Sequence, residues 1–324
     1  MQPQMGGTVQ QLVMPHYYPL NPQTLIPQQG DHQPRAACQS FNAQQDLVPQ
    51  HQIAILQERS RTIAAIKRAL IPPLSTSKRD RQRNATKYYS QYGQDHFVKQ
   101  RLFPRRKNGV FIEVGAVDGE YLSNTKYFDE NMDWTGLLIE ADPVNFEKLK
   151  ASGRNAWLLH GCLGNHSYAT TQLQLKTSST GGGRAMSYIP NLGTGENFVY
   201  DRYADKSGMQ YFNITCYPLG LILEVIGFSR VNYFSLDVEG AEPGVLMSLD
   251  FGRVTFGVVG IECNFCRQDL LDTLNGTVYE ETKMLRYFFK QFMKMKGYDE
   301  IERLGQDLFY APAGTKLLPL KKFN

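Results

Sequence analysis

Charge is nearly absent from the first 50 residues of the chain. They hold twelve Gln and seven Pro, and only Asp31, Arg35 and Asp46 carry charge. A segment of this composition buries too little apolar surface to offset the conformational entropy lost on ordering. We therefore predict a disordered Gln/Pro-rich tail over residues 1–50.

Long apolar runs are also lacking. No stretch of about 18 apolar residues occurs, which excludes an encoded transmembrane helix, and the N-terminus has no apolar core of a signal peptide. Both absences favour a cytoplasmic protein if the chain is complete as written. Four N-x-S/T sequons instead hint at the secretory pathway, and they begin at Asn84, Asn165, Asn213 and Asn275.

Cysteine is scarce and widely spaced. The five Cys do not predict a disulfide scaffold. Cys263 and Cys266 form a C-x-x-C pair, but a structural zinc site needs a second pair, and none is present. We interpret this pair as structural rather than redox-active, and we assign no residue to a metal centre.

Positive charge is concentrated in one stretch. Residues Arg59–Lys107 carry a net charge of +12, which leaves −8 for the rest of a chain whose total is +4. Within it, residues 51–70 have helical periodicity, and Pro72 follows. We expect residues 51–87 to form an isolated basic amphipathic helix and a linker. Contact with a membrane surface is the alternative, and no aromatic-rich pattern suggests nucleic acid.

From Tyr88 onward, short apolar runs alternate with helical segments. The five runs are 110–114, 136–140, 156–163, 231–237 and 256–262. Helices are expected from Ser123 as N-cap to Asn131, after the cap Asp142, over 218–227 and over 279–296. Strand pairs are expected at 168–175 with 211–217, as an insertion, and at 298–303 with 307–311. This order predicts an α/β domain over 88–312, with a mostly parallel twisted sheet, a closing antiparallel strand and a short tail over 313–324.

Ligands of such sheets bind beyond the carboxyl ends of the strands. The first run ends in a loop that contains Gly115 and Gly119, and the second ends in Glu140, 25 residues after Gly115. Glycines allow a tight turn near a ligand, and an acid at the second strand end can accept hydrogen bonds from ribose hydroxyls. The third glycine of a dinucleotide fingerprint is missing, which argues against a nicotinamide enzyme, and no P-loop follows.

Acidic residues also end the later runs. Alternation places Asp237 and Glu239 on the same side of their strand, and Glu262 ends the next run. Either of the first two could deprotonate a substrate hydroxyl, both could hold a divalent metal, or Asp237 could simply cap the turn. These three interpretations remain open.

Six blocks in order resemble the FkbM-type methyltransferases, and among them the animal Star-like proteins. The blocks are SQYGQDHFV, FIEVGAVDGEYLSNT, GLLIEADPVNFEKL, CYPL, YFSLDVEGAEPGVL and VVGIECN. The resemblance implies a class I (Rossmann-like) methyltransferase fold with S-adenosylmethionine as cofactor. It also implies methyl transfer to a hydroxyl oxygen of a small molecule or glycan.

The same resemblance implies roles for individual residues. Glu113, Gly115 and Gly119 would surround the methionine part of the cofactor, and Asp118 would also belong to the cofactor site. Glu140 would bind the ribose, and the segment Gly161–Leu163, which contains Cys162, would lie near the adenine. Asp237 would lie near the methyl group as the first choice for a general base, with Glu239 second.

A second function is left open by this resemblance. Star-like proteins are associated with vesicle trafficking between endoplasmic reticulum and Golgi or in endosomes. The alternative is therefore a non-catalytic protein of the endomembrane system that binds protein cargo, since a fold alone does not decide function.

Overall fold

The computed structural model describes residues 49–73, 86–178, 184–185, 187–189, 208–263 and 277–319, with side chains from 283 onward in the last range. Nearly all of the predicted tail over residues 1–50 lies outside these ranges, as do Asn84 and Asn275 of the sequons. Among the described residues, no helix combines the length and the apolar character needed to cross a membrane.

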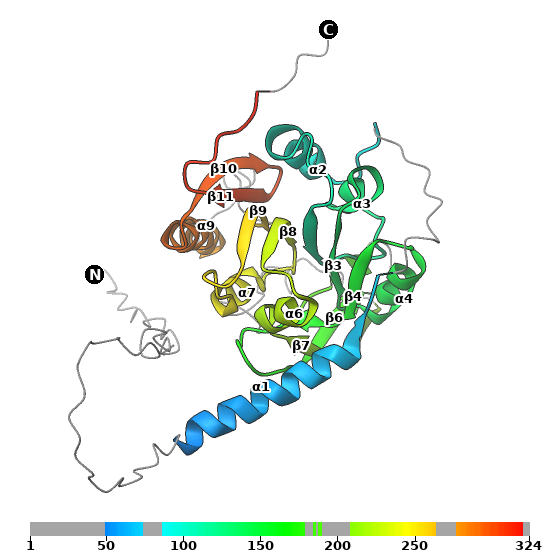
Figure 1. Cartoon of the computed structure of the whole chain (residues 1–324), viewed down its shortest axis with the longest axis vertical. Coiled ribbons are helices and arrows are strands. Elements are labelled where there is room, and N and C mark those ends of the chain that lie inside the picture. Colours follow the sequence, from blue (N-terminus) through cyan, green and yellow to red (C-terminus); the bar gives the residue numbers. More distant parts are fainter. Residues whose placement is uncertain are drawn as a thin grey trace, which may run out of the picture. The chain divides into compact units, whose positions relative to one another are not determined.

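A large mixed sheet forms the centre of the domain (Figure 1). Its order is β1-β4-β3-β2-β8-β9-β11-β10. The strands are β1 (Leu70–Ile71), β4 (Ala156–His160), β3 (Thr135–Glu140), β2 (Val110–Val114), β8 (Arg230–Leu236), β9 (Thr255–Glu262), β11 (Asp307–Pro312) and β10 (Tyr298–Leu304). The strands from β4 to β9 are parallel, and β11 runs antiparallel to β9 and to β10. This confirms the mostly parallel sheet and the closing antiparallel strands.

A second, smaller sheet contains the inserted strand pair. It consists of β5 (Cys162–Leu163), β7 (Met209–Tyr217) and β6 (Thr171–Ser178), in that order. The prediction of one strand over 156–163 was wrong, because the run divides at Gly161 between β4 and β5. A Cβ atom at Gly161 would lie 2.7 Å from the carbonyl oxygen of Thr215, so only glycine permits this close approach to β7.

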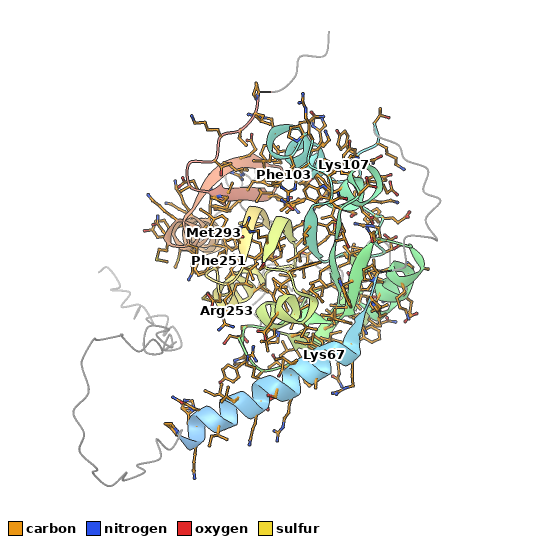
Figure 2. The ribbon with its side chains drawn as sticks, in the orientation of Figure 1. Lys67, Phe103, Lys107, Phe251, Arg253 and Met293 are labelled. Atoms are coloured by element: carbon orange, nitrogen blue, oxygen red, sulfur yellow. A yellow bond between two sulfur atoms is a disulfide. The ribbon has the colours of Figure 1, made fainter. Side chains whose placement is uncertain are left out.

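Helices cover both faces of the large sheet (Figure 1). One face packs against α1 (Gln50–Ala69), α6 (Leu219–Ile226), α7 (Glu242–Ser248) and α9 (Thr277–Met295). The apolar core on this face includes Met293, and the partly buried Phe251 packs against it; both are labelled in Figure 2. Aliphatic strand residues such as Ile112 and Ile261 point toward it.

The opposite face is richer in aromatic side chains. It packs against α2 (Gln94–Phe97), the π-helical turn η3 (Val98–Leu102), α3 (Lys126–Met132) and α4 (Pro143–Ala151). Phe111, Tyr233 and Phe309 contribute to this second core. Because side chains alternate along a strand, Glu113, Asp237 and Glu262 share this face with them.

Helix α1 is part of the folded unit, so the prediction of an isolated linker helix was wrong. Thr62 and Ile66 are buried, and Arg59 forms an ion pair at 2.5 Å with Glu224 of α6. Periodicity predicted the helix correctly but could not reveal the apolar surface of α6 that covers it. The N-terminal half of α1 stays exposed at Ile53 and Leu56.

The two predicted helix caps had different outcomes. Asp142 caps α4 as predicted, because its carboxylate accepts hydrogen bonds from the amides of Val144 and Asn145. The prediction that Ser123 begins a helix was wrong, since α3 begins at Lys126. The Ser123 hydroxyl does accept from the Lys126 amide at 3.1 Å, but it donates to Glu113 at 2.8 Å.

Cysteine spacing was a poor guide to covalent structure. Cys162 of β5 and Cys216 of β7 form a disulfide, although 54 residues separate them. Their pairing depends on β5 and β7 lying side by side with these two residues in register, which spacing does not encode. Cys263 is also disulfide-bonded, whereas Cys266 lies outside the described residues.

Candidate active site at the carboxyl ends of the strands

The order of the large sheet reverses next to β2. The chain runs outward through β3 and β4, and then returns to place β8 on the other side of β2. Ligands of open α/β sheets bind at this kind of switch point, beyond the carboxyl ends of the strands. The loops that follow β2, β3, β8 and β9 therefore define the candidate site.

Gly115 lies where the loops after β2 and β8 touch. Its φ of +82° is in the left-handed region, and an added Cβ atom would overlap the carbonyl oxygen of Asp237. The Asp237 amide also donates to the Val114 carbonyl at 3.3 Å. Any side chain at Gly115 would therefore force β2 and β8 apart at the switch point.

Glu140 holds the loop after β2 from the neighbouring strand. One carboxylate oxygen accepts from the Val117 amide at 2.7 Å and the other from the Asp142 amide at 2.8 Å. Val117 has a φ of +50°, an unusual conformation for a β-branched residue, and this hydrogen bond maintains it. Burial raises the pKa of Glu140 to about 8.

Asp118 and Gly119 shape the next turn. The Asp118 carboxylate accepts from the amides of Glu120 and Tyr121 at 2.9 and 2.7 Å. Gly119 has a φ of +80°, and its Cβ would meet Leu149 at 2.6 Å. The structure thus brings Asp118 and Gly119 into one turn, in which both have a clear role in local geometry.

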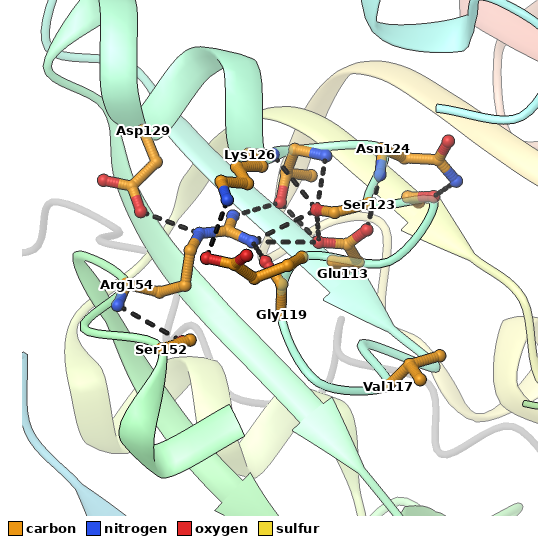
Figure 3. Close-up of polar contacts among 12 residues, drawn as sticks. Glu113, Val117, Gly119, Ser123, Asn124, Lys126, Asp129, Ser152 and Arg154 are labelled. Carbon is orange, nitrogen blue, oxygen red and sulfur yellow. Dashed lines mark hydrogen bonds and ion pairs between the residues drawn. The ribbon is translucent and has the colours of Figure 1, made fainter. Parts of the chain in front are cut away.

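Glu113 does not reach the rim of the site, because its carboxylate lies in a buried polar network (Figure 3). It accepts hydrogen bonds from Ser123, the Asn124 amide and Thr125 at 2.6–2.8 Å. The Arg154 guanidinium lies 3.9 Å away. Burial raises the pKa of Glu113, and Arg154 and these donors oppose the increase.

Arg154 is the centre of that network and was missed by sequence reasoning. Its guanidinium donates to Asp129 at 2.8 Å, to the Gly119 carbonyl at 2.6 Å and to Thr125 at 2.8 Å (Figure 3). No motif or spacing marks this arginine, because its partners lie 25 to 35 residues earlier in the chain.

Three carboxylates meet at the ends of β8 and β9. Asp237, Glu239 and Glu262 each offer an oxygen, and these oxygens all lie within 4.8 Å of one another. Glu239 adopts a left-handed φ of +55°. Burial raises the pKa of both Asp237 and Glu262, and the negative charges of Asp237 and Glu239 raise that of Glu262 further.

Further polar residues surround these carboxylates. Glu242 accepts from the Val238 amide at 2.9 Å, and burial raises its pKa to about 7. Asp307 accepts from Gln94 at 2.7 Å, and its pKa is raised to about 7, chiefly by burial and also by Asp237. Sequence analysis missed Gln94 and Asp307, although Gln94 lies in the first of the six resembling blocks.

The segment expected near an adenine begins beside Glu140. The Gly161 amide donates to the Glu140 carbonyl at 3.0 Å, but the side chains of Cys162 and Leu163 are buried in the smaller sheet. Because Cys162 is disulfide-bonded, this segment offers its backbone rather than a thiol to the site.

The chain is similar to known methyltransferases. Residues 113–298 match the family model described as Methyltransferase FkbM domain. Among solved structures, the chain is similar to the methyltransferase FkbM from Methylobacillus flagellatus KT, with 14% identity and a TM-score of 0.34. That match covers 63% of this chain and 43% of the other, so this chain spans less than half of that protein's length. No curated protein matches the chain.

Proposed function

The chain belongs to the FkbM methyltransferase family, and from this premise we propose that it methylates a hydroxyl oxygen of a small molecule or glycan with S-adenosylmethionine as donor. The observation that carries the proposal is the pair of acids on opposite sides of the switch point. Glu140 lies at the end of β3, on the side of the expected cofactor, and Asp237 lies at the end of β8.

The strand order supports a class I, Rossmann-like methyltransferase fold. Strands β4, β3 and β2 lie on one side of the switch point, and β8, β9, β11 and β10 lie on the other, with β11 antiparallel to its neighbours. This arrangement leaves the loops after β2 and β3 next to each other, where a nucleoside would bind.

The residues of these two loops fit S-adenosylmethionine. Each Glu140 oxygen accepts one backbone amide and keeps a further lone pair, which suits two ribose hydroxyls. Gly115 and Gly119 keep the loop after β2 free of Cβ atoms at its two tightest points. Gly115 and Gly119 would thus flank the methionine part, Glu140 would hold the ribose, and the backbone of Cys162 and Leu163 would border the adenine.

Bound S-adenosylmethionine supplies a methyl group that is already activated by its sulfonium. The chain's own residues then need only align the acceptor hydroxyl and remove its proton. Asp237 is our first choice for the base, because it is the partly exposed member of the three carboxylates. Glu239, two residues later and buried, is the second.

Calorimetric titration of the full chain with S-adenosylmethionine and S-adenosylhomocysteine tests the cofactor assignment. We expect saturable binding of both, and loss of binding in Glu140→Ala. Glu147→Ala is the matched control, because Glu147 is an exposed acid on the adjacent helix α4. Unchanged affinity in a folded Glu140→Ala protein would remove Glu140 from the ribose site.

The role of Asp237 requires turnover. With an acceptor found by screening hydroxyl compounds for release of S-adenosylhomocysteine, we expect Asp237→Asn to retain cofactor affinity and to lose about 10²–10⁴-fold in rate. Retained turnover in this variant would transfer the role of base to Glu239.

A non-catalytic, Star-like role in vesicle trafficking is the second candidate. The exposed Ile53 and Leu56 on the basic helix α1 support it, since this surface suits a membrane or a protein cargo. Failure of the folded, monodisperse chain to bind either cofactor form would make this candidate the leading one.

A further inference from the structure

Glu262, at the end of β9, has fewer hydrogen-bond donors around its carboxylate than a buried acid normally has. Glu262 is only 6% exposed. One of its oxygens accepts from the Gln306 amide, and the other, Oε2, is buried and has no donor among the described residues. Its other close partner is the carboxyl of Asp237, with which it can form a hydrogen bond only by sharing a proton. A buried acceptor without a donor indicates a missing proton or a missing cation.

The strongest electrostatic effects on Glu262 come from charges of its own sign. These charges are on Asp237, Glu239 and Glu242, and each one disfavours the ionisation of Glu262. Among the described residues, no lysine or arginine forms an ion pair with Asp237 or Glu262. Buried acids at such distances cannot all remain ionised unless a positive charge lies between them.

The convergence of three carboxylate oxygens favours a bound ion. We propose that Asp237, Glu239 and Glu262 together bind a hard divalent cation such as Mg²⁺ or Mn²⁺. Three carboxylate oxygens and no nitrogen or sulfur ligand form the donor set that hard cations prefer. Such a site lies outside the cofactor loops, on the acceptor side of the switch point.

The three oxygens must move closer together to form an octahedral site. Two oxygens bound to one Mg²⁺ at about 2.1 Å lie about 3.0 Å apart as neighbouring ligands and about 4.2 Å apart as opposite ligands. The three oxygens here are within 4.8 Å of one another, so side-chain shifts on the order of 1–2 Å or less would close the site. Asp237 is partly exposed and follows the end of β8, which leaves its side chain room to move.

A cation here would also act on the acceptor, a consequence that rests on the proposed methyl transfer. Mg²⁺ keeps several coordination positions for water or substrate oxygens when three carboxylates bind it. An acceptor hydroxyl bound at one of these positions loses its proton more readily. Asp237 could bind the ion through one oxygen and accept the proton on the other.

The test measures Mn²⁺ binding directly. The full chain, freed of metal with EDTA and dialysed, is titrated with Mn²⁺ in the absence of S-adenosylmethionine, with the paramagnetic resonance of free Mn²⁺ as readout. We expect saturable binding of a single ion that Mg²⁺ displaces. We also expect binding at least ~10-fold weaker in Glu262→Gln. Asp237→Asn, at the more exposed ligand, repeats the test if Glu262→Gln does not fold.

Glu140→Gln is the matched control, because Glu140 is an equally buried acid at the end of a parallel strand. It should lose affinity for S-adenosylmethionine and keep Mn²⁺, whereas Glu262→Gln should do the opposite. Absence of Mn²⁺ binding by the folded wild-type chain overturns the cation site. So does a Mn²⁺ affinity in Glu262→Gln and Asp237→Asn that equals that of the wild type. Mn²⁺ binding without cofactor binding overturns the proposed function and leaves the cation site standing.

Discussion

Two groups of buried acids on one face of the same sheet differ sharply in their partners. Glu113 of β2 has an arginine, two hydroxyls and a backbone amide around its carboxylate. Glu262 of β9 has the Gln306 amide as a donor, and its other close partners are acids, of which Asp237 forms a hydrogen bond with it. Burial is nearly the same, with 3% and 6% exposed.

The difference separates a structural acid from a functional one. A buried carboxylate with a complete set of donors stabilises the loop that supplies those donors, here the segment from Ser123 to Thr125. A buried carboxylate next to other carboxylates costs stability in the free protein, and functional sites are where such a cost is found. Burial and residue type alone would have assigned both groups the same role.

The largest expected effect comes from removing Arg154, the positive charge beside Glu113. Arg154→Met leaves Glu113 and Asp129 buried without their cation, so we expect a loss of about 3–5 kcal/mol in the free energy of unfolding. Chemical denaturation measures it. The control is Arg253→Met, because Arg253 is 73% exposed and its two ion pairs are solvated. A similar loss in both variants would mean that burial does not determine how much an arginine contributes to the free energy of unfolding.

A substitution at Gly115 tests the close contact between the loop after β2 and Asp237, which follows β8. Gly115→Ala places a side chain at a positive φ and against the Asp237 carbonyl, and we expect a loss of about 2–4 kcal/mol. Gly220→Ala is the control, since nothing lies within 4 Å of its Cβ position in helix α6. That variant should gain up to about 1 kcal/mol. Equal stabilities of the two variants would contradict the close approach at the switch point.

A matched pair of neutral substitutions should give effects of opposite sign. Glu113→Gln loses charge-assisted hydrogen bonds and should destabilise the fold by about 1–3 kcal/mol. Glu262→Gln removes a like charge and, measured in EDTA at pH 8, should stabilise the fold by about 1 kcal/mol. Destabilisation by both would show that the second group is as well satisfied as the first.

The buried acids also predict a dependence of stability on pH. Burial raises the pKa of Glu140 to about 8 and the pKa values of Glu242 and Asp307 to about 7, from ordinary values of 4.5 or 3.8. Each group binds its proton more tightly in the folded state. The stability that this contributes is complete below about pH 4 and is lost as the pH rises through 7 to 8.

Unfolding with urea at pH 6 and at pH 8.5, in EDTA, measures this dependence. We expect the free energy of unfolding to fall by about 1.4 kcal/mol per pH unit for each group that keeps its proton only when folded. Glu140→Gln should flatten the decline above pH 7. A flat profile for the wild-type chain would indicate that these acids are ionised in the folded state.

Much of the fold could be predicted from local patterns. The apolar runs that became β2, β3, β8 and β9 were found to within a residue, because buried parallel strands are continuous apolar segments. The cap Asp142 and the end of α6 at Gly227 also follow from local chemistry. The errors at Ser123, at Gly161 and in the packing of α1 have a common cause, since each depends on a distant partner.

The candidate site was predictable only in part. Its acids stand at the ends of apolar runs, and the rule for ligand sites in α/β sheets selects Glu140, Asp237 and Glu262. The rule cannot say which acids have partners. The partners come from residues far away in the chain: Glu113 has Arg154, Asp307 has Gln94 and Glu262 has Gln306.

The sequence by itself determined the order of strands and helices, the glycines of the loop after β2 and the acids at the strand ends, because these depend on residues near one another in the chain. Only the tertiary structure decided that Glu113 is neutralised, that Cys162 is bonded to Cys216, and that Asp237, Glu239 and Glu262 converge. The electrostatic environment of a buried charge is set by groups within a few ångströms in space, and those groups are brought together by the packing of the sheet.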